Sequence, residues 1–115
     1  MNECPHLAII TERHSQRSVL RLRGELDMST RDRLRHAVDS ALEGHPPILV
    51  VDLSELDFAD CAGLSILVCA QKLLMAGGSE LVTVGAKPIV RRLLQLTGLD
   101  TYLHLGPLEC PQRPR

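Results

Sequence analysis

Residues 48–53, ILVVDL, are the stretch that most strongly indicates the fold. Apolar side chains follow one another here, without the alternation of a strand that has one face in water. Such a run is typical of an interior strand of a parallel sheet, because both of its faces are covered. We therefore expect an α/β domain with a strand at residues 48–53. The stretch SELDFAD, residues 54–60, is predicted to be the loop after this strand.

A helix is predicted to follow this loop, with Asp60 as its N-cap and the pair Gly77-Gly78 as its end. Cys61 therefore stands at the exposed beginning of this helix. Cys69, eight residues later, is interpreted as a small core residue. The side chains expected to form the buried stripe are Leu64, Leu67, Val68, Leu74 and Met75.

The segments on either side extend the same pattern. Upstream, residues 7–13 and 17–24 are predicted to be two strands joined by a hairpin, because Leu20 and Leu22 alternate with arginines. Residues 24–27 are read as a turn, and Ser29 or Thr30 as the cap of a helix that Gly44 ends. Downstream we expect a strand at 80–85, a helix from Pro88 to Gly98 and a short strand at 101–105. The apolar side of that last helix is expected to comprise Ile89, Val90, Leu93, Leu94 and Leu96.

The predicted order of elements is β-β-α-β-α-β-α-β, which implies a mixed sheet with parallel crossovers. The chain has 115 residues, which fits one domain, expected at residues 1–106. The proline-rich residues 107–115 are expected to form a flexible tail. Apolar residues make up 44% of the chain and aromatic residues only 2%, so we expect an aliphatic core.

Composition also argues against several classes of partner. Phe58 and Tyr102 are the only aromatic residues, and the net charge is −1, so we expect no nucleic-acid partner. No apolar run approaches the ~20 residues of a membrane span, and the N-terminus lacks the pattern of a signal peptide. We therefore expect a cytoplasmic protein without membrane insertion.

The motifs of common enzymes are absent as well. The four cysteines and five histidines have no metal-binding spacing, and there is no phosphate-binding loop or GxSxG nucleophile motif. A cysteine-dependent enzyme would need a thiolate at Cys61. The helix N-terminus favours that thiolate, whereas the acids Asp57 and Asp60 oppose it. We expect no enzyme, no cofactor, no metal and no small-molecule substrate.

Four segments together resemble the STAS-domain family, and within it the stand-alone bacterial anti-sigma factor antagonists. They are GELD at 24–27, VVDLSELDFAD at 50–60, AGL at 62–64 and LVTVGAKPIVRRLLQLTGLD at 81–100, and the resemblance covers roughly residues 7–105. It implies a STAS fold and a role in partner switching, in which the antagonist binds an anti-sigma factor and frees a sigma factor. Transcription, commonly in a stress response, is thereby regulated indirectly.

The resemblance also predicts that Cys61 occupies the position of a regulatory serine. In this family a serine normally follows the aspartate that matches Asp60, and the anti-sigma factor, a serine kinase of the histidine-kinase-like ATPase fold, phosphorylates it. Here that position is Cys61 and the next residue is Ala62. We rank first a steric replacement of serine without a phosphorylation switch. Oxidation of the thiol ranks second, and phosphorylation displaced to Ser54 or Ser65 ranks third.

The resemblance implies a partner-binding surface around this position. From the residues alone, Asp27 can simply close a turn and Asp60 can simply cap a helix. The alternative function within the family is a STAS subunit of a lipid-transport ATPase complex or of a signalling scaffold. The residues expected to bind the partner are Asp27, Phe58, Asp60, Cys61, Ala62, Gly63 and Leu64.

Overall fold

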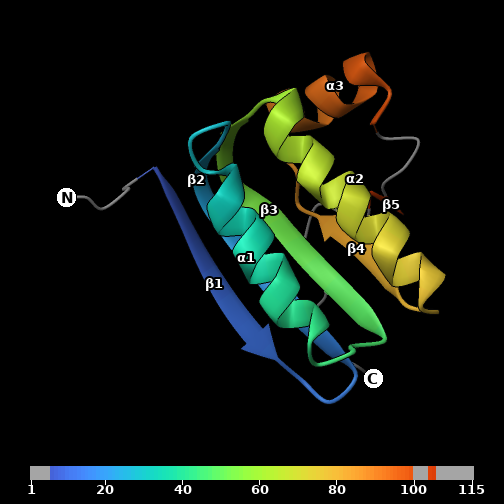
Figure 1. Ribbon diagram of the computed structural model, residues 1–115. Coiled ribbons are helices and arrows are strands. Elements are labelled where there is room, and N and C mark those ends of the chain that lie inside the picture. Colours follow the sequence, from blue (N-terminus) through green and yellow to red (C-terminus); the bar gives the residue numbers. More distant parts are fainter. Residues whose placement is uncertain (1–5, 100–103, 106–115) are drawn as a thin grey trace.

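The computed structural model of the protein describes residues 6–99 and 104–105. Within them, five strands and three helices follow one another in the predicted order (Figure 1). The expected tail at 107–115 and the first part of the expected last strand, 101–103, lie outside the described residues. The elements are β1 (Leu7–Arg13), β2 (Arg17–Leu26), α1 (Arg31–Leu42), β3 (Ile48–Ala59), α2 (Cys61–Ala76), β4 (Glu80–Val84), α3 (Pro88–Thr97) and β5 (His104–Leu105).

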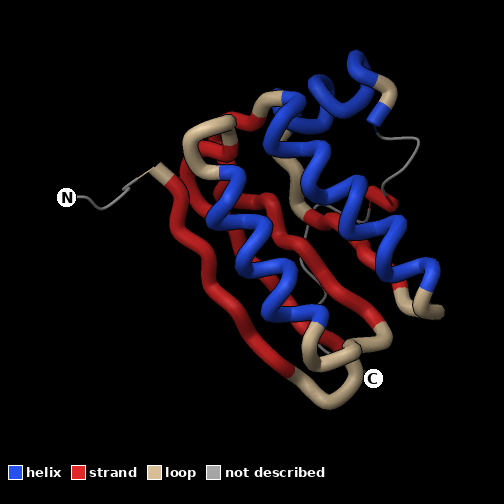
Figure 2. Tube along the Cα trace, in the orientation of Figure 1, coloured by secondary structure: helices blue, strands red, loops and turns tan. Residues whose placement is uncertain are grey.

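The strands form one mixed sheet in the order β1-β2-β3-β4-β5. β1 and β2 are an antiparallel hairpin, and each later neighbour is parallel. β3 is therefore an interior strand, as its apolar run predicts, and its Val51 pairs with Leu20 on one side and Thr83 on the other. Figure 2 shows α1 and α2 lying across one face of the sheet.

The core lies between this face and the helices. Alternate residues of the strands, such as Leu20, Leu49 and Leu53, point towards the helices and are fully buried. They pack in one cluster with helix side chains such as Leu67 and Leu94. Among the residues that the structure describes, every large side chain that is almost fully buried is a leucine, so the core is aliphatic, as the composition predicts.

The prediction of a loop at residues 54–60 is wrong, because β3 continues to Ala59. β2 is correspondingly longer and supplies the pairing partner, with Leu26 opposite Ala59. The predicted turn at 24–27 is also wrong, since the chain turns after Leu26 and Thr30 precedes α1. Gly24 instead has φ 110° inside β2, and a Cβ there would lie 2.2 Å from the His6 carbonyl oxygen. Glycine permits both the irregular strand and this close approach.

Two side chains expected to be buried, those of Cys69 and Met75, are in fact exposed. Cys69 is exposed because it lies about 140° around α2 from the buried Leu64, at 100° per residue. Met75 is in the last turn of α2 and is 58% exposed. Ile89 and Leu96 belong to the apolar side of α3, yet 62% and 74% of their surfaces are exposed. That helix buries Val90 and Leu94 and leaves the rest of its apolar side uncovered.

Candidate functional site

The junction between β3 and α2 is fixed by three hydrogen bonds of Asp60. Its backbone N–H donates to the Leu26 carbonyl at 3.0 Å, and its own carbonyl accepts from the Leu64 N–H at 2.9 Å. Its carboxylate Oδ1 accepts from the Gly63 N–H at 2.8 Å. Asp60 is thus the N-cap of α2, as the sequence predicts.

Gly63 lets the first turn of α2 lie directly against the end of β2. A Cβ at Gly63 would come within 2.5 Å of Leu26 Cγ and 3.1 Å of the Leu26 carbonyl oxygen. Real Cβ atoms essentially never approach another atom to 2.5 Å, so any larger residue here would require Leu26 or the helix to shift. Gly63 is buried, and so is the next residue, Leu64, at 0% exposure. Both residues lie beneath the surface that Cys61 and Ala62 present.

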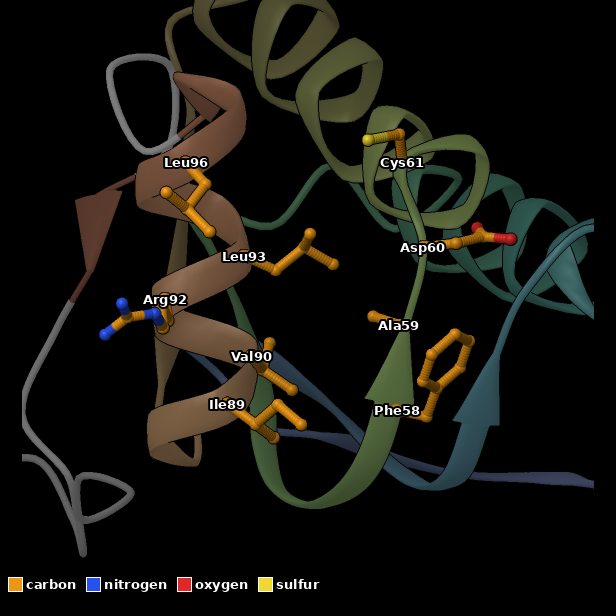
Figure 3. A pocket seen from close by; sticks show the side chains of 9 residues that line it. All are labelled: Phe58, Ala59, Asp60, Cys61, Ile89, Val90, Arg92, Leu93 and Leu96. Atoms are coloured by element: carbon orange, nitrogen blue, oxygen red, sulfur yellow. The ribbon is translucent and has the colours of Figure 1, made fainter.

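Cys61 is the first residue of α2, and its thiol is exposed. Figure 3 shows its sulfur on the side that faces α3, whereas the Asp60 carboxylate points the opposite way. The two residues that the resemblance singles out therefore act on different sides of one junction. Asp60 fixes the helix, and Cys61 presents its side chain to the neighbouring surface.

A groove of about 390 Å³ opens beside Cys61. Phe58 of β3, 47% exposed, lines it together with Cys61 on one side. The opposite wall is α3, whose Leu93 side chain points into the groove in Figure 3 while Arg92 points away. The remaining lining residues are Ala59, Asp60, Ile89, Val90 and Leu96.

The sequence did not lead us to predict that α3 contributes to this site. Ile89, Leu93 and Leu96 recur at the spacing of one helix face, and that pattern is the same for a core helix and for a docking surface. An ion pair between Lys87, just before α3, and Asp57 of β3 holds the beginning of α3 beside the end of β3. α3 thus forms one wall of the site. The sequence motif around Asp60 and Cys61 did not indicate this wall.

Asp27 lies in the turn between β2 and α1, directly after the Leu26 carbonyl that binds Asp60. Its Oδ1 accepts hydrogen bonds from the Ser29 hydroxyl at 2.6 Å and the Ser29 N–H at 2.9 Å. The Ser29 hydroxyl is the main reason that the pKa of Asp27 lies below its ordinary value. Asp27 therefore closes this turn as a carboxylate, and the adjacent Met28 is 68% exposed.

Two negative findings concern the described part of the chain. In residues 6–99 and 104–105, no three or more His, Cys, Asp or Glu side chains are grouped so that they could hold a metal ion. No helix among the same residues is long and apolar enough to cross a membrane.

Comparison with known proteins gives the family. The family described as "Mlab, STAS domain" matches residues 9–107. The chain belongs to the STAS-domain family. This domain is 35% identical to the Anti-sigma F factor antagonist of Paenibacillus polymyxa, over 82% of this chain and 81% of that protein. It is 33% identical to the Anti-sigma-F factor antagonist RsfB of Mycobacterium tuberculosis, over 80% of this chain and 75% of that protein.

Solved structures confirm the STAS fold. A crystal structure of an anti-sigma factor antagonist from Mycobacterium paratuberculosis superposes with a TM-score of 0.80 and 33% identity, covering 90% of this chain and 89% of that one. The anti-sigma factor antagonist SpoIIAA in its unphosphorylated form gives a TM-score of 0.73 at 23% identity, covering 86% and 88%, and shows the fold alone.

Ser54 and Ser65, the two alternative phosphorylation positions expected from the sequence, lie outside the lining of the groove. Ser65 is in the second turn of α2, and its Oγ donates to the Ala62 carbonyl at 2.7 Å. Ser54, expected in a loop, is an exposed residue of β3. It precedes Ala59 by five residues, or roughly 17 Å at the rise of a strand. Neither serine lines the groove.

Proposed function

We propose that this STAS-domain protein binds an anti-sigma factor and thereby releases a sigma factor, so that it acts on transcription by partner switching. The observation that supports this most is the exposed Cys61 at the beginning of α2, bordered by an uncovered apolar groove. Relatives at 33–35% identity over about four fifths of the chain carry the name of anti-sigma factor antagonists. On this proposal the protein works in the cytoplasm, by binding and without catalysing a reaction.

The proposed contact surface has two parts. Asp27, Phe58, Asp60, Cys61 and Ala62 form the part around the junction. Ile89, Leu93 and Leu96 on α3 form the other part, because they border the same groove. Gly63 and Leu64 support this surface from below, since both are buried.

The apolar groove suits the central part of a protein interface. Interfaces place aromatic and aliphatic side chains at their centre and polar groups around them. Phe58, Ile89 and Leu96 are each 47–74% exposed in the isolated chain, so a partner that covers them removes apolar surface from water. The charged side chain of Arg92 points away from the groove in Figure 3, which leaves the centre apolar.

The partner that we propose is an anti-sigma factor of the serine-kinase type. Cys61 offers it a thiol of nearly the size of a serine side chain but no hydroxyl to phosphorylate. We therefore propose that docking persists when ATP is present. Oxidation of the exposed Cys61 thiol is the second mechanism by which docking could be regulated. Phosphorylation of Ser54 or Ser65 is the third, and both positions lie off the groove.

Affinity capture from the native cells tests the proposed function. The tagged protein is used as bait under reducing conditions and after mild peroxide, and Ile89→Asp serves as a bait with a damaged groove. We expect an anti-sigma factor to be captured by the native chain in both conditions and to be lost with Ile89→Asp. Capture only under reducing conditions would instead make Cys61 a redox trigger. Capture of transport-complex subunits in place of an anti-sigma factor would overturn the proposal.

A further inference from the structure

A cleft of about 300 Å³ lies between α1 and α2, and all of its lining residues belong to these two helices. Figure 1 shows the helices side by side on one face of the sheet, running in the same direction. The floor of the α1–α2 cleft is apolar, because Val38, Ile66 and Ala70 are 4%, 8% and 2% exposed. Cys69 and Leu73 border it and are both exposed. None of these residues lines the groove against α3, so the cleft is a separate surface.

α2 is unusually apolar for a helix that has one side in water. Lys72 is the only charged residue among its 16, whereas five of the 12 residues of α1 are charged. A surface helix normally carries charged and polar residues on the side that faces water. On α2 that side instead carries Cys69, Leu73 and Ala76, all of them exposed. The outer face of α2 thus has the composition of a surface that another chain covers.

Two opposite charges stand on the α1 side of the cleft. Arg35 and Asp39 both line it, both are exposed, and they are roughly 6 Å apart along the helix axis. Within the described residues, neither side chain belongs to an ion pair. A base four residues before an acid is also the less favourable order for pairing within one helix. Both charges are therefore available to a partner.

The lining residues of the two helices are centred at one level. Arg35 and Asp39 are centred on residue 37, and the lining residues of α2, from 66 to 73, are centred beside Cys69. A two-fold axis that crosses both helices at this level lays a second copy antiparallel over the first. Arg35 of one protomer then lies over Asp39 of its partner, and the reverse contact forms as well. The charges of the cleft are thus complementary to those of a second copy.

We propose that the α1–α2 cleft is a self-association surface, on which two copies of the chain pair as a symmetric, antiparallel dimer. Leu73 and Ile66 are equally far from the centre of the lining residues of α2, so Leu73 of each protomer covers the apolar floor near Ile66 of the other. The two Cys69 thiols lie beside the axis. Because the cleft and the groove beside Cys61 share no lining residue, one dimer presents two sites for the proposed anti-sigma factor.

Analytical ultracentrifugation of the purified chain alone tests this proposal, and we expect the native chain to dimerise. Arg35→Asp and Asp39→Arg should each lower the association constant at least about tenfold, because like charges then face each other twice. Mixed in equal amounts, the two variants should associate with each other, since both contacts of the mixed pair again join an arginine to an aspartate. A change in helix stability cannot produce this rescue, because the residues that pair are on different chains.

Two matched variants separate the cleft from the groove against α3. Leu73 and Ile89 are 63% and 62% exposed, and only Leu73 lines the cleft. Leu73→Asp should lower the association constant at least about tenfold, whereas Ile89→Asp should leave it unchanged. Equal loss in both variants would overturn the proposed surface. No anti-sigma factor takes part in these measurements, so their outcome does not depend on the proposed function.

Cross-linking tests the position of the two-fold axis. A chain in which Cys4, Cys61 and Cys110 are replaced by serine keeps Cys69 as its only thiol. A short bismaleimide should join two such chains rapidly, and Arg35→Asp should slow the reaction at least about tenfold. A native chain that stays monomeric up to about 1 mM would overturn the proposal. Single variants that dimerise like the native chain, or mixed variants that fail to associate, would also overturn it.

Discussion

The Asp60 carboxylate accepts a hydrogen bond of 2.8 Å from the backbone N–H of Gly63. Asp60 also binds the Leu26 carbonyl through its own N–H. One residue therefore joins the end of β2 to the first turn of α2. Cys61 follows directly, so the orientation of its thiol depends on this cap.

Replacing Asp60 with alanine separates the capping role from a contact with the partner. Loss of the cap should lower the free energy of unfolding by about 1 kcal/mol. If Asp60 also contributes to the proposed interface, the affinity for the anti-sigma factor should fall by more than this. Denaturant unfolding and calorimetric titration measure the two effects. Unchanged affinity with lowered stability would leave Asp60 as a cap only.

Gly63→Ala should destabilise the domain, because the new methyl group would meet the Leu26 side chain and carbonyl. Overpacking of this kind lowers the free energy of unfolding by about 1–3 kcal/mol. Gly77→Ala is the matched control, since a Cβ there has its nearest neighbour at 3.7 Å. Urea unfolding of both variants tests the comparison, and equal stabilities would refute the close contact between α2 and β2.

Ile89→Asp should weaken binding of the anti-sigma factor about tenfold or more, as loss of a central interface residue does. Leu73→Asp offers a matched control, since Leu73 is 63% exposed and Ile89 62%, and Leu73 does not line the groove. Both variants should keep the stability of the native chain within about 0.5 kcal/mol. Surface plasmon resonance with the purified partner gives the affinities. Equal loss in both variants would argue against the groove as the docking site.

The titration of Asp27 should depend on the Ser29 hydroxyl. Because that hydroxyl lowers the pKa of Asp27 in the folded chain, Ser29→Ala should raise it towards the ordinary value of 3.8. The native chain then gains stability from this group above pH 3.8 and loses the gain as the pH falls through the lowered pKa. An NMR titration of the Asp27 carboxyl carbon measures the shift. No change in Ser29→Ala would contradict the assigned cause.

The sequence predicted the element order and the interior strand well, because Ile48 to Leu53 and the capping Asp60 are strong local signals. It predicted the extent of β3 poorly. Residues 54–59 contain Ser, Asp and Glu, which favour loops, yet they pair with β2 through a register that shifts near Gly24. Pairing between distant strands supplies hydrogen bonds that no local pattern reveals.

The candidate site was found only in part for a related reason. Cys61 and Asp60 could be placed because a cap and a helix start are local features. The groove depends on how α3 lies against β3, and the apolar spacing of Ile89, Leu93 and Leu96 is the same for buried and exposed faces. Burial of Leu64 and exposure of Cys69 likewise depend on which side of α2 meets the sheet.

The most direct test of the account measures phosphorylation and binding together. The native chain and Cys61→Ser are each mixed with the purified anti-sigma factor kinase and Mg-ATP, and phosphate incorporation and complex formation are followed over time. We predict that the native chain takes up no phosphate and stays bound, whereas Cys61→Ser is phosphorylated and released. Phosphorylation and release of the native chain, or failure of both chains to bind, would contradict the account.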